Sequence, residues 1–233
     1  MNRLRIGKFR ATDRMCDLID DNYHALLVLS RFNIALGFGD RTIGEICSEN
    51  RVDAATFLAV INLMYNDNRP PTQEKPQLSI ECLIEYLYNS HHFFLKFRLP
   101  EMRRKLKESL NDGDSDLNNA MIGYFDNFVS ALKKHTFTEN KKIFPYVRAL
   151  LNGEAPSKML ITLQKQHEQI QFSLTEFKSV LIKYYPAVKA NEINSFLFDI
   201  FNCEKDLASH NAVEEYLFQP EIDALEAKIR KTV

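Results

Sequence analysis

The sequence lacks the features of several large protein classes. Its 233 residues include 7 glycines and 8 prolines, which are too few for the closely spaced turns of an all-β chain. No uninterrupted apolar run approaches the roughly 18 residues of a transmembrane helix, and the basic start of the chain contains no signal-peptide core. These absences favour a cytoplasmic, largely helical protein that is not bound to a membrane.

An excess of charge of one sign is also missing. Thirty basic residues face 31 acidic ones, for a net charge of -1. Nucleic acid is therefore not an expected partner, because its phosphates select proteins with a positive field. The four cysteines, Cys16, Cys47, Cys82 and Cys203, form no C-x-x-C pair and are expected to be reduced thiols.

The periodicity of apolar residues divides the chain into two helical regions. Residues 1–66 hold short helices that break at LGFGDRT, and Asp53 is placed to cap the helix AATFLAVINLMYN. The proline-rich segment 67–78 is predicted to be a linker. Residues 79–233 hold four long helical segments with short connections. We therefore predict an all-α fold, in which an up-down-up-down four-helix bundle follows a small helical N-terminal domain.

Each long segment carries a histidine within the apolar stripe that should face the bundle interior. The first two stripes are predicted to include Ile84, Tyr88, His92, Leu95 and Leu99, and then Tyr124, Phe128, His135 and Glu139. The other two are predicted to include Leu160, Leu163, His167 and Ile170, and then Cys203, Leu207, His210 and Glu214. Since residues four apart share a helix face, each histidine and glutamate pair can converge on one site.

The spacing of these histidines repeats along the chain. His92 and His135 are 43 residues apart, and so are His167 and His210. A glutamate follows the second histidine of each pair by four residues. Residues equidistant from a tight turn lie level on antiparallel helices, so the four imidazoles should meet in one layer.

The whole unit recurs after 75 residues. Pro145 and Pro220 keep the same offset, which indicates a duplicated helix pair. His91 does not keep it, because the residue 75 positions later is Gln166. We therefore predict that His92 binds metal and that His91 does not.

Six residues are thus predicted to be metal ligands: His92, His135, Glu139, His167, His210 and Glu214. A lone histidine in an apolar stripe is usually a core residue, but the repeated H-x-x-x-E pattern favours a metal site. Buried imidazoles and carboxylates would be costly without a cation. Such ligands suit iron, zinc, copper or nickel, and two carboxylates able to bridge favour a pair of non-haem iron ions with an additional oxo bridge.

Residues 79–228 resemble the hemerythrin-like domain of the repair-of-iron-centres family. The similar motifs are HHFFLKFRLPEM, HTFTENKKIFPYV, LQKQHEQI and HNAVEEYLFQPEI. In this resemblance His92 takes the place of the first family histidine, judged by its distance to Leu99 and Pro100. The segment RFNIALGFGDRTIGEICSENRVD is similar to the family's N-terminal domain. However, Gly37 and Phe38 stand where the family commonly has two adjacent cysteines, which argues against a thiol-based role.

The resemblance implies a di-iron protein that supports the repair of iron–sulfur and other iron centres under nitrosative or oxidative stress. Nitric oxide and dioxygen would be its ligands at iron, and iron–sulfur proteins would be its clients. A second hypothesis is a sensor or carrier that binds dioxygen or nitric oxide without turnover. A third is a structural zinc bundle, which would be colourless.

Overall fold

The chain folds into helices throughout the residues that the structure, a computed structural model, describes: 9–69, 77–112, 115–154 and 164–232. The N-terminal helices are α1 (Met15–Asp21), α2 (Ala25–Arg31), α3 (Ile43–Glu49) and α4 (Ala54–Tyr65). Within these ranges the β pairing amounts to one isolated bridge between Arg14 and Thr42. None of the described helices is long and apolar enough to span a membrane. The predicted all-α class is confirmed.

The remaining helices form four lines, three of which change type along their length. They are α5 (Ile80–Phe93), η1 (Phe94–Arg98) and α6 (Leu99–Ser109); α7 (Ser115–Thr138), η2 (Glu139–Ile143) and α8 (Phe144–Leu151); α9 (Gln164–Tyr184); and α10 (Ala190–Val213), η3 (Glu214–Phe218) and α11 (Gln219–Thr232). The three η segments are π-helices of five residues each.

The chain divides into two compact units. One comprises residues 1–90, 148–155 and 209–233, and the other comprises residues 91–147 and 156–208. Helices α5, α8 and α10 each contribute to both units. The linker expected at 67–78 stays a prediction, because residues 70–76 lie outside the described ranges.

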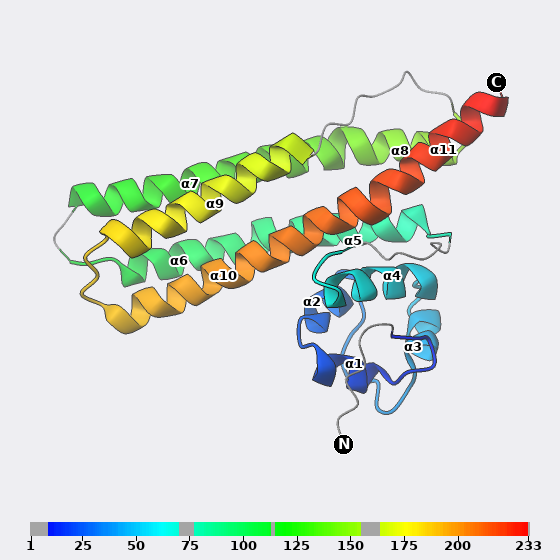
Figure 1. The fold of residues 1–233 in the computed structure, drawn as a ribbon, viewed down its shortest axis with the longest axis horizontal. Coiled ribbons are helices and arrows are strands. Elements are labelled where there is room, and N and C mark those ends of the chain that lie inside the picture. Colours follow the sequence, from blue (N-terminus) through cyan, green and yellow to red (C-terminus); the bar gives the residue numbers. More distant parts are fainter. Residues whose placement is uncertain (1–8, 70–76, 113–114, 155–163, 233) are drawn as a thin grey trace. The chain divides into compact units, whose positions relative to one another are not determined.

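The second unit is a four-helix bundle made of α6, α7, α9 and most of α10, which run side by side in Figure 1. Its core contains three mutually packed phenylalanines, Phe125, Phe177 and Phe196, whose ring centroids lie 5.9 to 6.2 Å apart. Each is fully buried, and burying a side chain of this size contributes roughly 1.5–3 kcal/mol. The predicted bundle of antiparallel helices is confirmed.

The apolar stripes are as predicted in α9 and α10, whereas each of the first two lines exposes a tyrosine that was predicted to face the core. Tyr88 and Tyr124 are 52% and 43% exposed, so they do not face the core. Leu87 and Phe125, one residue away from each, are buried instead. Leu160 and Leu163 of the third stripe lie outside the described residues.

Asn111 joins the two connections at one end of this bundle. Its backbone N–H donates to the Tyr185 hydroxyl at 2.6 Å, and its side chain bonds the carbonyl of Pro186 and the N–H of Val188. The Tyr185 hydroxyl in turn donates to Asn118 at 3.0 Å. These bonds connect the α6–α7 turn to the α9–α10 turn, so the two helix hairpins keep their register.

In the other unit the N-terminal helices pack against α5. The ring of Phe32 lies 5.0 Å from that of Tyr86 and 5.4 Å from that of Phe57, measured between centroids. The buried guanidinium of Arg31 donates to the Tyr86 hydroxyl at 3.4 Å. Asp53 accepts a hydrogen bond from the backbone of Thr56 at 2.8 Å, which confirms it as the cap of α4.

Each π-helix is followed by a proline at the second position of the next α-helix: Pro100, Pro145 and Pro220. Inside an α-helix a proline removes one hydrogen bond and clashes with the carbonyl four residues earlier. An extra residue in the preceding turn relieves that conflict. The prolines therefore account for the place of the π-helices in the sequence.

Candidate metal centre

Two of the helix lines present a histidine and a glutamate one turn apart, as the H-x-x-x-E spacing predicts. His135 lies near the end of α7 and Glu139 opens η2, and their Nε2 and Oε2 atoms are 3.4 Å apart. His210 lies near the end of α10 and Glu214 opens η3, with Nε2 and Oε1 2.9 Å apart. All four side chains are buried, so each carboxylate is removed from water at the point where α-helix changes to π-helix.

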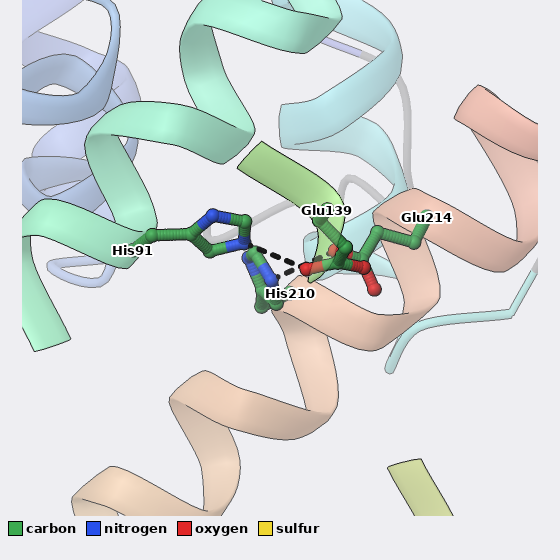
Figure 2. A group of neighbouring side chains, drawn as sticks. All are labelled: His91, Glu139, His210 and Glu214. Carbon is green, nitrogen blue, oxygen red and sulfur yellow. Dashed lines mark ion pairs between the residues drawn. The ribbon is translucent and has the colours of Figure 1, made fainter. Parts of the chain in front are cut away.

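The other two lines contribute imidazoles. In α9, Nε2 of His167 lies 3.2 Å from Nε2 of His135. In α5, Nε2 of His91 lies 3.1 Å from Oε2 of Glu139. Figure 2 shows His91, Glu139, His210 and Glu214 turned toward one another, with the two ion pairs dashed.

These side chains form two overlapping groups of metal-ligating atoms. The first consists of His91, Glu139, His210 and Glu214, and the second of His135, Glu139, His167 and Glu214. Within each group the ligand atoms all lie within 4.8 Å of one another. Both glutamates belong to both groups, so each carboxylate can serve two ions at once.

The chemistry of the donor atoms fits a bound cation. A carboxylate is acceptor-only when ionised, and a neutral imidazole has one nitrogen that accepts. Acceptor atoms that face one another at about 3 Å in a dry interior need a proton or a cation between them. Oxygen and imidazole nitrogen in this combination are ligands for iron and other transition metals.

The structure corrects the prediction for the first helix, where His91 and not His92 joins the cluster. His91 is 1% exposed, whereas the neighbouring His92 is exposed. The other five predicted residues, His135, Glu139, His167, His210 and Glu214, all belong to the two groups.

The physical reason for this correction is the π-helix η1. The predicted stripe stepped back from Leu99 in α-helical intervals of three or four residues and so reached His92. The buried residues instead run His91, Phe94 and Leu99, with a step of five across η1. Pro100 was the available signal, because a proline deep in a helical pattern requires such a rearrangement.

Cys47 is the cysteine nearest in sequence to Gly37 and Phe38, where the repair-of-iron-centres family commonly has two adjacent cysteines. Its thiol is buried. Burial raises its pKa to about 12, so the thiol is neutral near pH 7 and is a poor nucleophile or metal ligand. This supports packing as the role of Cys47.

The sequence model of a protein family, described as the hemerythrin HHE cation-binding domain, matches residues 82–222, which is more than half of the chain. All residues of both ligand groups lie inside the matched range. No curated protein matches the chain.

Proposed function

Because the chain belongs to the hemerythrin HHE cation-binding family, we propose that its buried histidine and glutamate cluster binds two iron ions. The observation that carries this proposal is the sharing of both carboxylates between two ligand groups. A site for a single ion would need four to six donors, and this cluster offers a matched set for each of two ions.

We assign one ion to His91 and His210 and the other to His135 and His167, with Glu139 and Glu214 bridging. This assignment keeps five of the six residues that the sequence indicated and replaces His92 with His91. It is supported by the burial of all six side chains and by the membership of the two groups.

The proposed ligand set leaves room for a small molecule. Four imidazole nitrogens and four carboxylate oxygens supply about eight donors, whereas two six-coordinate ions need about twelve. Iron bound here would supply the open positions at which nitric oxide or dioxygen binds. The surrounding helices contribute apolar side chains beside these positions, such as the buried Phe144, whose ring stacks on His91.

We further propose that the protein supports the repair of iron–sulfur and other iron centres under nitrosative or oxidative stress. The support is the resemblance of its histidine motifs to the repair-of-iron-centres family. The missing cysteine pair at Gly37 and Phe38 favours a role carried by the iron centre alone. The alternative is a sensor or carrier that binds dioxygen or nitric oxide without turnover.

Metal analysis and an absorption spectrum of the purified protein test the di-iron proposal. We expect about two irons per chain, with absorption bands of a bridged ferric pair after oxidation. Stoichiometric zinc and a colourless protein would contradict it and favour a structural bundle.

Titration of the anaerobic ferrous protein with nitric oxide then tests the open positions. A change in the absorption and electron paramagnetic resonance spectra within a few equivalents is expected. An unchanged spectrum would contradict small-ligand binding. Full recovery of the starting spectrum when the gas is removed, over many cycles, would favour the carrier over the repair role.

A further inference from the structure

Asn140 contacts the metal centre without supplying one of its ligands. It is the second residue of η2, directly after Glu139, and its side chain is half-buried. Its Oδ1 atom lies 2.9 Å from Nδ1 of His91, while Oε2 of Glu139 lies 3.1 Å from Nε2 of the same ring. Two consecutive residues of one π-helix therefore meet the two nitrogens of one imidazole.

The contact with Asn140 favours a proton on Nδ1 of His91. An amide oxygen can only accept a hydrogen bond, so Nδ1 of His91 must be the donor. A neutral imidazole has a single N–H, which leaves the lone pair on Nε2. With a cation in the first ligand group, that lone pair can bind the cation beside Glu139, whereas without one the Glu139 carboxylate would compete for a proton at Nε2.

Phe144 holds the same ring from its face. The rings of His91 and Phe144 stack with an interplanar angle of 4° and a centroid distance of 5.8 Å. Phe144 follows Glu139 by five residues, and its N–H bonds the Glu139 carbonyl in the manner of a π-helix. The π-helix thus brings Glu139, Asn140 and Phe144 to one ring, where Asn140 is the residue of the three that contacts Nδ1.

We propose that Asn140 is a positioning residue that holds His91 as the Nδ1–H tautomer and so presents Nε2 to the metal. The inference rests on the proposed function, in which His91 binds one of two ions. It concerns that ion alone. The residue 75 positions after Asn140 in the repeat is Glu215, which is exposed.

Two substitutions separate this role from simple packing. Asn140→Leu removes the acceptor at nearly constant side-chain size, and Asn140→Asp keeps an oxygen at the same place. Asn127→Leu, on the exposed surface of α7, is the matched control for a leucine placed on this helix line. Circular dichroism establishes that each variant is folded.

The first measurement uses metal-free Glu139→Ala protein with ¹⁵N-labelled histidine, at a pH where the imidazoles are neutral. This background removes the carboxylate that would otherwise accept a proton from Nε2 of His91. Ring-nitrogen shifts should place the His91 proton on Nδ1 in Glu139→Ala and in its Asn140→Asp and Asn127→Leu derivatives. Adding Asn140→Leu should remove this preference. A proton on Nε2 in Glu139→Ala itself, or an unchanged preference after Asn140→Leu is added, would overturn the proposal, and the result for Glu139→Ala decides even if the Asn140→Leu derivative does not fold.

The second measurement follows iron release to a chelator from the reconstituted protein. Partners of metal-bound histidines typically change metal affinity by about 10–100-fold. Asn140→Leu should therefore release one of its two irons about 10–100-fold faster, while Asn140→Asp and Asn127→Leu match the wild type. Equal release by all four proteins would overturn the inference. If the wild type takes up no iron, the proposed function fails, and the ring-nitrogen measurement still decides the role of Asn140.

Discussion

The two helix lines that carry a glutamate are alike, whereas the two that carry only a histidine differ. In α7–η2–α8 and in α10–η3–α11, the glutamate opens a π-helix and a proline follows six residues later. In the histidine-only lines, α5–η1–α6 contains a π-helix and α9 is α-helical over Gln164–Tyr184. The 75-residue repeat therefore holds for the two glutamates and for His135 and His210, and it fails by one residue for His91 and His167.

One additional residue in a helix is enough to change which of two adjacent side chains is buried. The π-helix η1 adds one residue between His91 and Leu99, so the spacing from His91 to His135 is 44 residues against 43 for His167 and His210. A strict 75-residue repeat pairs His167 with His92, whereas in the structure His91 is the histidine of α5 that lies in the ligand cluster.

The largest effect is expected from the two glutamates, because each belongs to both ligand groups. Glu139→Ala and Glu214→Ala should each lose most of both irons, as measured by metal analysis. Glu215→Ala, at the exposed neighbouring position, is the control and should keep full metal content. Metal loss in only one of the two glutamate variants would show that Glu139 and Glu214 do not have equivalent roles.

The adjacent histidines should differ by about one iron per chain. His91→Ala removes a ligand of the first group and should retain about half of the metal. His92→Ala changes an exposed side chain and should be nearly silent. The reverse outcome would mean that the first line keeps the strict repeat.

A deletion can make the first line resemble α9. Removing exposed Lys96 together with Pro100→Ala should turn η1 into α-helix, because His91 and Phe94 would then lie seven and four residues before Leu99. We expect the deletion variant to keep both irons, as measured by metal analysis. Loss of one iron would show that the π-helix itself is needed to place His91. Deletion of Lys96 alone, with Pro100 retained, is the matched comparison, and we expect it to be less stable.

The two helix hairpins also differ in the exposure of an ion pair that joins their helices. Arg103 bonds Asp126 across α6 and α7 at 2.7 Å, and Lys178 bonds Glu204 across α9 and α10. The Arg103–Asp126 side chains are 40% and 41% exposed, against 16% and 20% for Lys178–Glu204. Exposed pairs contribute about 0.2–1 kcal/mol, so Glu204→Gln should cost more stability in urea unfolding than Asp126→Asn. Equal losses of unfolding free energy in the two variants would contradict the expectation that the more buried ion pair contributes more to stability.

The smallest effect is the pH dependence of the Asp126 pair. Hydrogen bonding to Arg103 lowers the pKa of Asp126 below its ordinary value. Its contribution is therefore complete above the ordinary pKa of an aspartate and is lost as the pH falls through the lowered pKa. Wild type and Asp126→Asn should differ in unfolding free energy at neutral pH and converge in acid. A gap that persists at the lowest pH would exclude this ionisation as its cause.

The sequence by itself determined the helical class, the four-helix bundle, the Asp53 cap and five of the six clustered residues. Each of these depends on local periodicity or on a spacing that fixes a helix face, such as His135 with Glu139. The buried residues Ile170 and Leu207 were likewise predicted, because their helices keep the regular 3.6-residue period.

Only the tertiary structure decided between His91 and His92. Adjacent residues on a helix point about 100° apart, so one inserted residue in η1 is enough to exchange an exposed and a buried side chain. The contact of Asn140 with His91 was equally inaccessible, since it joins residues 49 positions apart on two different helices. Local periodicity is read along one helix, whereas the register between helices is set by packing across the bundle.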